Sequence, residues 1–591
     1  MIARPLAFVL TALLVSSAGV AEPVVIVPDS AMMSKLFANR TASTRVVPVQ
    51  GQPFESALQV TVNEPGEYGY SVQLTASSVS PIRKGDVIFV TLYARTVQAR
   101  NATGEGQLLV FLQKAGPPFS KAVYQLFGVP TTWTKIELPF KNTVLDTEAG
   151  GAALALGFGA DAQTIEIAGA TAVNYGPDYD LGTLPMTRLT YAGRELDAPW
   201  RAEAAARIER HRKGDLTVVV EDAAGNAVPD ASVKVEMTRH AYRFGAAIYL
   251  FRWAEQSPTG ERFREEILRN FNYVMPENSL KWQALEGDYG PGERERAVAF
   301  LQWAKDHGLH TQGHVLVWPG KAYTPKKYLD LLHPERAAEL RAAINDHIRR
   351  IIAETRPNVD EWQVVNELWG NRDFTKILGD GEVAEWFRLA HREAPGVRLF
   401  INDYGIIDEY LNERSPHLRD YEKTIADLIA QGAPIGGIGS QSHFGTFCTP
   451  PQTIYTILER LARFDLPVQT TEFDVHIRDE DLQADYLRDY LTMFFSHPIT
   501  TGFCHWGFWE GQHWKPHAAL LRKDWSEKPN MKVWRDLVYN QWWTNAAGTT
   551  DAAGKLEVRG FLGEYRVTVE GAAPVAATLG REGATVVVRL P

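Results

Sequence analysis

The sequence predicts a multidomain protein: a (β/α)₈ TIM barrel, an N-terminal β-sandwich of jelly-roll type, and a small discontinuous β-sandwich formed by segments flanking the barrel. Three observations support this fold class. The chain has 591 residues, more than one compact domain of ordinary size holds. Apolar strands alternate with segments of helical period over residues 241–544. The flanking regions alternate apolar and polar residues between glycine and proline turns, as antiparallel strands do.

The composition limits the classes of ligand. Hydrophobic residues make up 45% and charged residues 22% of the chain, as in ordinary soluble globular proteins, so disorder and coiled coils are excluded. The net charge is −10, whereas nucleic-acid binding depends on Lys and Arg at phosphates, so no nucleic-acid partner is expected. All tryptophans except Trp133 and Trp200 lie between Trp253 and Trp543, so we expect aromatic faces to be used in that part of the chain.

Residues 1–21 are predicted to be an export signal. Arg4 precedes an apolar run from Leu6 to Leu14, and the small residues up to Ala21 form a cleavage site. The run is shorter than a membrane-spanning helix, and no cysteine stands near the cut to carry a lipid. We therefore expect a secreted or periplasmic protein without a membrane anchor, and we expect a monomer.

Cysteine is too scarce to build a disulfide framework. Only Cys448 and Cys504 are present in this long chain. The two can pair with each other, or they can stay as two buried thiols, and the second interpretation is favoured.

Residues 22–195 predict the N-terminal sandwich, because short alternating stretches recur between turns without a helical period. The segment Lys84–Arg95 (KGDVIFVTLYAR), with Trp133 ahead of a later strand, resembles the jelly-roll carbohydrate-binding modules attached to many polysaccharide hydrolases. Two interpretations of its aromatic residues stay open, a sugar-stacking face or ordinary sandwich core. The residues concerned are Tyr68, Tyr70, Tyr124, Phe127 and Trp133.

A linking helix is predicted over residues 196–213, which are rich in Ala, Glu and Arg. Beyond it, Leu216–Val220 and Val233–Met237 predict the two strands of a hairpin, which alone is only marginally stable. The missing strands are expected from the end of the chain. Residues 214–240 and 545–591 would then form one discontinuous sandwich, which resembles the transthyretin-like domains. The alternative is two separate strand pairs packed on the barrel.

The barrel is predicted from eight strand–helix units within residues 241–544. Each strand is a short apolar run, and each helix has apolar residues at helical spacing. In such a barrel the carboxyl ends of the strands surround the active site, so the polar residues that close each strand are candidates for chemistry. The predicted strands end near Tyr249, Pro276, Val317, Asn366, Asp403, Gln441, Glu472 and Trp506.

Two carboxylates close apolar strands: Glu367 ends WQVVNE, and Glu472 stands in TTEFDV. By strand count they close strands four and seven, so both are expected to point into one mouth. Glycoside hydrolysis requires two carboxylates across a cleft, one to protonate the leaving oxygen and one to meet the positive charge at the sugar carbon. Structural ion pairs and metal ligands are the alternatives for two glutamates alone.

The other strand ends favour a sugar site. Hydrogen-bonding side chains and tryptophan faces converge there, which is the usual composition of a saccharide pocket. No HExxH, Walker, GxSxG or CxxC pattern is present, so no metal and no cofactor are expected. The candidate substrate-binding residues are Asn278, Lys281, His314, Trp318, Asn366, Tyr404, Gln441, His443, Trp506 and Trp514.

Eight sequence blocks, in order along residues 241–543, carry a resemblance to a known family. The blocks FGAAI, ENSLKW, GHVLVW, WQVVNE, NDYGI, GIGSQSHF, TEFDV and WGFWEGQHW are similar to the signature blocks of the family-10 glycoside hydrolases, the retaining endo-β-1,4-xylanases. The resemblance implies Glu367 as acid/base and Glu472 as nucleophile. It implies that Asn366 bonds the sugar 2-hydroxyl at the cleavage point and that His443 orients Glu472. The implied glycone-side contacts are Lys281, His314, Gln441, Trp506 and Trp514, with Asn278 one sugar further out.

The sequence departs from the family pattern around the cleft. Pro319 and Lys321 replace a His and a Gln, Lys515 replaces an Arg, and Trp509–Glu510 replaces smaller residues. The expected reaction is hydrolysis of β-1,4-xylosidic bonds in xylan, a polysaccharide substrate, through a glycosyl-enzyme on Glu472. The alternatives are a hydrolase of another β-1,4-linked plant polysaccharide and a non-catalytic carbohydrate-binding protein.

Overall fold

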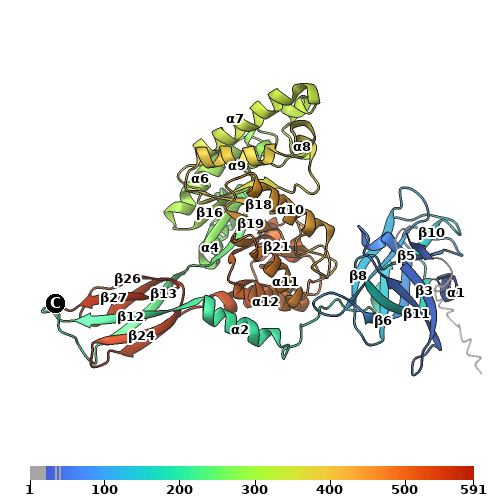
Figure 1. Cartoon of the computed structure of the whole chain (residues 1–591), viewed down its shortest axis with the longest axis horizontal. Coiled ribbons are helices and arrows are strands. Elements are labelled where there is room, and N and C mark those ends of the chain that lie inside the picture. Colours follow the sequence, from blue (N-terminus) through green and yellow to red (C-terminus); the bar gives the residue numbers. More distant parts are fainter. Residues whose placement is uncertain (1–21, 33–35, 39–41) are drawn as a thin grey trace, which may run out of the picture. The chain divides into compact units, whose positions relative to one another are not determined.

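The structure is a computed structural model, and it describes residues 22–591 apart from 33–35 and 39–41 (Figure 1). The predicted export signal, residues 1–21, lies outside the described residues. None of the helices in the described part of the chain is both long and apolar enough to cross a bilayer.

The chain divides into two compact units. Among the described residues, the first consists of 22–99 with Gly106–Arg188, and the second of Arg100–Glu105 with Leu189–Pro591. The predicted N-terminal sandwich falls in the first unit, whereas the predicted barrel and small sandwich fall in the second.

The first unit is a β-sandwich of two antiparallel sheets. One sheet has the strand order β3-β4-β11-β6-β9 with β1 beside β11, and the other has the order β2-β5-β10-β7-β8. Alternate residues of several strands in the two sheets face a shared apolar core, among them Val90 and Leu92 of β6 and Leu154 and Leu156 of β10. The strands are β1 Val24–Val27, β2 Leu36–Ala38, β3 Ala42–Pro48, β4 Ser56–Val62, β5 Val72–Ser77, β6 Val87–Gln98, β7 Gly106–Lys114, β8 Lys121–Val129, β9 Thr134–Lys141, β10 Ala152–Gly157 and β11 Gln163–Asn174.

The predicted (β/α)₈ barrel is confirmed in the second unit. Its parallel strands follow the order β14-β15-β16-β17-β18-β19-β21-β22, and the sheet closes because β22 pairs with β14. Strand β16 ends at Gly313, earlier than the predicted end near Val317, although Val317 still bonds to the backbone of Val364 on β17. The strands are β14 Arg243–Ile248, β15 Tyr273–Pro276, β16 His310–Gly313, β17 Glu361–Asn366, β18 Arg398–Asp403, β19 Gly437–Ser440, β21 Val468–Val475 and β22 Thr500–His505.

Amphipathic helices cover the outside of the barrel (Figure 1). α10 illustrates why they form where they do: the Ser415 hydroxyl accepts the Leu418 amide as an N-cap, and Pro416 occupies the first helical turn. Its buried residues, including Tyr421 and Ile425, recur at helical spacing and face the strands. The main helices are α4 Pro258–Asn270, α6 Glu293–Asp306, α7 Ala337–Thr355, α9 Glu382–Glu393, α10 Pro416–Ala430, α11 Pro451–Ala462, α12 Glu480–Ser496 and α13 Pro529–Asp536.

The small sandwich joins segments from both sides of the barrel, and strands early and late in the sequence lie side by side in Figure 1. One sheet has the order β24-β12-β27 and the other β23-β13-β25-β26. The strands are β12 Lys213–Glu221, β13 Ser232–His240, β23 Asn545–Thr549, β24 Lys555–Phe561, β25 Gly563–Val569, β26 Val575–Leu579 and β27 Ala584–Arg589.

The predicted hairpin between Leu216–Val220 and Val233–Met237 is wrong. β12 pairs with β24 and β27, whereas β13 pairs with β23 and β25 in the other sheet. Burial explains the difference, because alternate residues in the middle of both strands are apolar and buried: Leu216, Val218 and Val220 of β12, and Val233, Val235 and Met237 of β13. A lone hairpin would leave the apolar face of both strands in water. Two sheets packed face to face bury the apolar residues of β12 against those of β13.

Arg212 ties the linking helix α2 (Trp200–His211) to the barrel. The residue is 6% exposed. Its guanidinium donates to the carbonyl oxygens of Phe495 at 2.6 Å and Thr500 at 3.0 Å, and it lies over the Tyr242 ring at 4.9 Å from the centroid. Burial lowers the pKa of Arg212 to about 10, yet the group stays charged at neutral pH.

We expect Arg212→Met to destabilise the second unit by about 2–3 kcal/mol, because buried carbonyl oxygens of Phe495 and Thr500 would lose their donor. The denaturant concentration at half-unfolding, followed by tryptophan fluorescence, measures this change. Arg210→Met is the matched control, since Arg210 is exposed on the same helix. Equal midpoints for the two variants would contradict this role of Arg212.

Candidate active site

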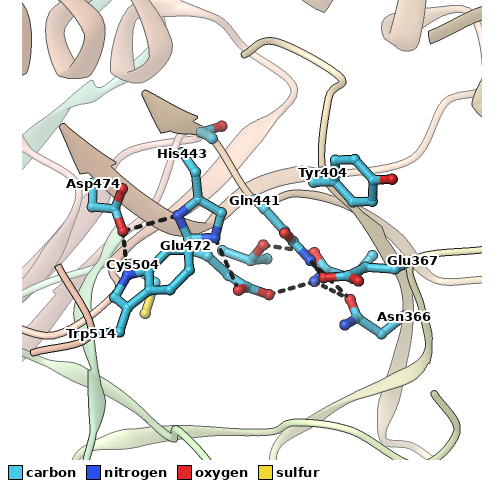
Figure 2. Close-up of polar contacts among 12 residues, drawn as sticks. Asn366, Glu367, Tyr404, Gln441, His443, Glu472, Asp474, Cys504 and Trp514 are labelled. Carbon is cyan, nitrogen blue, oxygen red and sulfur yellow. Dashed lines mark hydrogen bonds and ion pairs between the residues drawn. The ribbon is translucent and has the colours of Figure 1, made fainter. Parts of the chain in front are cut away.

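The two predicted carboxylates lie at carboxyl ends of barrel strands, within one group of polar side chains (Figure 2). Glu367 directly follows β17, and Glu472 lies within β21. The backbone of Glu367 has φ 55°, a left-handed conformation that a non-glycine residue adopts at an energetic cost. It is held there by backbone hydrogen bonds to Asn402 and Asn371. The strained turn fixes the direction in which the Glu367 side chain leaves the strand.

Amide side chains connect the two carboxylates. Gln441 Nε2 donates to Glu367 Oε1 at 2.9 Å and to Asn366 Oδ1 at 3.2 Å. Asn402 Nδ2 donates to the same Asn366 oxygen at 2.9 Å and to Glu472 Oε1 at 2.9 Å. Within the described residues, Asn366 Nδ2 is buried without a hydrogen-bond partner. A buried donor without a partner is unfavourable, so this amide is ready to donate to a bound hydroxyl group.

His443 lies between two carboxylates, and Figure 2 shows Asp474 and Glu472 on either side of its ring. Its Nδ1 is 3.0 Å from Asp474 Oδ2, and its Nε2 is 3.3 Å from Glu472 Oε2. Burial alone would lower the pKa of His443, but Asp474 and Glu472 outweigh it and raise the pKa well above its ordinary value. The imidazolium therefore donates from both nitrogens. Trp514 Nε1 donates to Asp474 at 2.7 Å. Hydrogen bonds therefore run from Trp514 through Asp474 and His443 to Glu472.

The pKa values of the two glutamates shift in opposite directions. Burial raises the pKa of Glu367 to about 7, and the charge of Glu472 adds to this effect. Burial would also raise the pKa of Glu472, but the hydrogen bond and charge of His443, together with the charge of Lys281, lower it below the ordinary value. Near neutral pH the site can therefore hold one protonated and one ionised carboxyl group, as acid–base chemistry on a single bond requires.

We expect His443→Gln to reduce kcat/KM about 10- to 100-fold at pH 5 and less at pH 7. The positive charge of His443 favours ionised Glu472, so its removal raises the pKa of Glu472 and moves the acidic limb of the pH profile upward. Kinetics on a soluble substrate across pH measure the shift. His517→Gln, an exposed histidine, is the control, and an unmoved acidic limb would refute the role.

Lys281 connects several predicted contacts. Its Nζ donates to Asn278 Oδ1 at 2.7 Å and lies 5.1 Å from the Trp318 ring centroid and 5.9 Å from that of Trp506. Burial lowers the pKa of Lys281. The ammonium group is thus shielded from solvent and placed between aromatic rings, where its remaining protons can bond to a ligand oxygen.

His314 is neutral and its tautomer follows from its neighbours. Burial lowers its pKa to about 4. Gln363 Nε2 donates to Gln312, so Gln363 Oε1 is the acceptor that faces His314 Nδ1 at 2.7 Å. Nδ1 therefore carries the proton, and Nε2 is left as an acceptor. The ring contacts Trp506 edge-on, with centroids 5.3 Å apart.

Trp318 offers less to a substrate than its position predicts. The Tyr323 ring stacks on it with centroids 3.4 Å apart and planes at 11°, so one indole face is covered. The loop that carries Tyr323 is clamped, because Gln283 Nε2 donates to the carbonyl of Ala322 at 3.0 Å and the Lys321 amide donates to Asp373. Tyr323 is thus a cleft residue in the region where the sequence departs from the family pattern.

The remaining predicted aromatic contacts differ in exposure. Trp506 is 7% exposed and packs on the barrel interior, whereas Trp514 is 52% exposed. Tyr404 meets the buried His417 ring edge-on, with centroids 4.7 Å apart. The structure thus brings the predicted residues together around one mouth, and Trp514 is the most exposed of the predicted aromatic contacts, although Lys515 Nζ lies 4.8 Å from its ring centroid.

Asn402 and Tyr323 lie in the site but were not among the predicted substrate-binding residues. Asn402 closes strand five in the block NDYGI, so the strand-end rule alone contained the signal for it. Tyr323 lies in a loop well beyond its strand, and no periodic pattern places such a residue. Loops at the carboxyl face of a barrel are positioned by contacts between loops, which local sequence does not encode.

Structural ion pairs and metal ligation are the alternative roles for the two glutamates. Among the described residues, Glu367 forms no ion pair with Lys, Arg or His, and Glu472 pairs with His443. The described part of the chain contains no group of three or more His, Cys, Asp or Glu that could hold a metal ion. Cys448 and Cys504 are both buried and free, which agrees with the interpretation of two thiols.

About half of the chain is similar to a known protein family. The Glycosyl hydrolase family 10 profile matches residues 231–536, just over half of the chain. An anti-sigma-I factor of Acetivibrio thermocellus is 28% identical over 394 residues, which cover 66% of this chain and 49% of that protein. Endo-1,4-beta-xylanase 1 of Arabidopsis thaliana is 27% identical over 361 residues, which cover 61% and 37%. The chain thus spans half or less of the length of these two relatives.

A solved structure, native xylanase 10B from Thermotoga maritima, is 24% identical with a TM-score of 0.46 and covers 51% of this chain and 96% of that one. The profile match contains the barrel strands from β14 to β22 and both glutamates of the mouth. On the extent of that match, the chain belongs to glycosyl hydrolase family 10.

Proposed function

We propose that the protein is a retaining endo-β-1,4-xylanase, with Glu472 as nucleophile and Glu367 as acid/base. One observation carries the proposal: two carboxyl groups at one mouth with opposite pKa shifts, joined through Asn366, whose amide donor has no partner among the described residues. Xylan as the substrate is supported by the family and by relatives named as endo-1,4-beta-xylanases.

The reaction runs in two displacements. An oxygen of ionised Glu472 attacks the anomeric carbon, while the glycosidic oxygen departs with the proton of Glu367, giving a glycosyl-enzyme and a shortened chain. Water then attacks the same carbon and gives a proton to Glu367, which releases the sugar and restores ionised Glu472. The Asn366 amide would bond to the 2-hydroxyl of the sugar at the cleavage point. Two inversions leave the configuration retained.

The test is release of reducing sugar from xylan, with NMR of the first product formed. We expect a β-configured product and fragments of several lengths, which indicate retention and endo action. An α-configured first product would rule out the double displacement. A panel of glucuronoxylan, arabinoxylan, mixed-linkage glucan and glucomannan distinguishes xylan from another β-1,4-linked polysaccharide as the substrate.

A non-catalytic carbohydrate-binding protein is the second candidate. One relative carries the name of an anti-sigma-I factor and not that of a xylanase. Absence of release from every polysaccharide in the panel, with binding retained, would favour this candidate. The intact set of Glu367, Glu472, Asn366 and His443 argues against it, because binding alone needs no pair of carboxyl groups with opposed pKa values.

We further propose a secreted or periplasmic location and a monomeric state. The location rests on the apolar run and small residues within residues 1–21. Mass analysis of the mature protein, with an N-terminus expected at Glu22, tests the location, and light scattering tests the monomer.

A further inference from the structure

We infer that the first unit carries a second polysaccharide site, on an exposed patch formed by Tyr68, Tyr70, Lys121 and Tyr124, here called the tyrosine patch. Its occupant is a β-1,4-linked polysaccharide chain. The identity of that chain as xylan rests on the proposed function, whereas the existence of the patch site does not.

The patch presents large aromatic surface to solvent. Tyr68, Tyr70 and Tyr124 are 42%, 38% and 43% exposed. The rings of Tyr68 and Tyr70 stack in parallel, with centroids 5.1 Å apart and planes at 4°. Contiguous exposed aromatic surface is unfavourable in water and marks a binding site more often than chance placement does.

The structure separates these three tyrosines from the other two aromatic residues that the sequence grouped with them. Phe127 is 6% exposed and belongs to the sandwich core. Trp133 precedes β9 in the other sheet, packs edge-on against Phe54 at 4.9 Å and lies under Arg95. The core interpretation therefore holds for Phe127, whereas the patch tyrosines are exposed and stay candidates for the sugar-stacking face.

The patch rests on a rigid base. Tyr124 of β8 is directly opposite Phe111 of β7, which is 1% exposed. Tyr70 lies in a short 3₁₀ turn, Gly69–Ser71, that packs on β10. A side chain at Gly157 would stand 2.8 Å from the carbonyl oxygen of Gly69, so only glycine lets this turn approach the sheet. The tyrosines are thus held at fixed positions, which lowers the entropic cost of binding.

Lys121 supplies a hydrogen-bond donor at the centre of the patch. Its Nζ lies 6.0 Å from the Tyr70 centroid and 5.9 Å from those of Phe111 and Tyr124. Across the residues that the structure describes, no carboxylate lies within ion-pair distance of it. Gln113, paired with Lys121 across the strands, adds a half-buried amide.

This chemistry fits a neutral sugar chain better than other ligands. Sugar rings present C–H faces that pack on tyrosine rings and hydroxyl groups that accept from an ammonium or an amide. A single lysine is too little charge for a nucleic acid, which requires several phosphate contacts. The same chain also carries a family-10 barrel, so a site for its polymeric substrate would raise the local concentration of that substrate.

The experiment measures retardation of the full-length chain in native gels containing soluble xylan. All proteins carry Glu472→Ala so that the polymer is not consumed. We expect the Tyr70→Ala/Tyr124→Ala double variant to bind about tenfold more weakly. Val46→Ala, an exposed residue on the other sheet, should bind as the parent does. Lys121→Met keeps all the aromatic rings and should weaken binding as well. It tests the patch even if the double variant fails to fold.

A second measurement uses the patch variants with Glu472 intact. Hydrolysis of a short aryl xylobioside should be unchanged, whereas hydrolysis of insoluble xylan should fall severalfold. The inference would be overturned if both patch variants were retarded as strongly as the parent by every polysaccharide tested. It would also be overturned if both patch variants lost retardation only because they unfold. Patch-dependent retardation by another polysaccharide, without xylan hydrolysis by the intact chain, would refute the proposed function and leave the patch site standing.

Discussion

Replacement of Glu472 by alanine should reduce kcat for xylan by on the order of 10⁴-fold or more, because the first displacement loses its nucleophile. The carboxylate is 4% exposed and receives hydrogen bonds from Asn402 and His443, so it is held in place before substrate arrives. Alanine removes the one of the two predicted catalytic carboxyl groups that is ionised near neutral pH. Asp474, the other carboxylate bonded to His443, lies on the opposite side of the imidazole, at Nδ1.

Initial rates of reducing-sugar release, compared at equal protein concentration, measure this loss. Glu385→Ala is the matched control, since Glu385 is an exposed acid on α9 that pairs with Arg388. Binding of xylan to the Glu472 variant should persist, because the aromatic and amide contacts remain. A residual rate within tenfold of the parent would assign the nucleophile to another residue.

Replacement of Glu367 by alanine should give a loss that depends on the leaving group. Xylan has a poor leaving group that must be protonated, so its hydrolysis should fall about 10²- to 10⁴-fold. An aryl glycoside with an acidic phenol departs without protonation, so its first step should change little. The second step still lacks its base, and the glycosyl-enzyme should therefore accumulate. Mass spectrometry of the acid-quenched variant should find one glycosyl group on Glu472.

The pH profile gives an independent test of the same residue. Burial raises the pKa of Glu367 to about 7, so the proton donor is present below that pH and is lost as the pH rises through it. The basic limb of kcat/KM on xylan should therefore fall near pH 7 in the parent. In Glu367→Ala, assayed on the aryl glycoside, that limb should disappear. A basic limb that survives unchanged would mean that another group donates the proton.

Much of this architecture follows from local patterns in the sequence. Alternation with period two and helical spacing predict the strands and helices, and the repeated strand–helix order predicts a closed parallel barrel. Once the barrel is assumed, Glu367 and Glu472 must share a mouth, because all strands of a parallel barrel end at the same face. The strand-end rule also contained Asn402, which the structure places between Asn366 and Glu472.

Other features depend on which surfaces meet. The periodicity of β12 and β13 identifies their apolar faces but not the strands that cover them, so the predicted hairpin was replaced by pairing with strands from the end of the chain. Tyr323 stacks on Trp318 because the loop that carries Tyr323 places its ring there. The separation of Phe127 from Tyr124 follows from which side of β8 faces the core.

The sequence by itself determined the barrel, the two carboxyl groups and the family resemblance, because these depend on residue identity and spacing along one chain. Only the tertiary structure decided the protonation states and the accessible aromatic faces. A pKa depends on burial and on the distance to charges such as His443 and Lys281, which arrive from other strands. How much of an aromatic ring is accessible depends on its neighbours in space: Tyr323 covers one face of Trp318, whereas Tyr124 is 43% exposed.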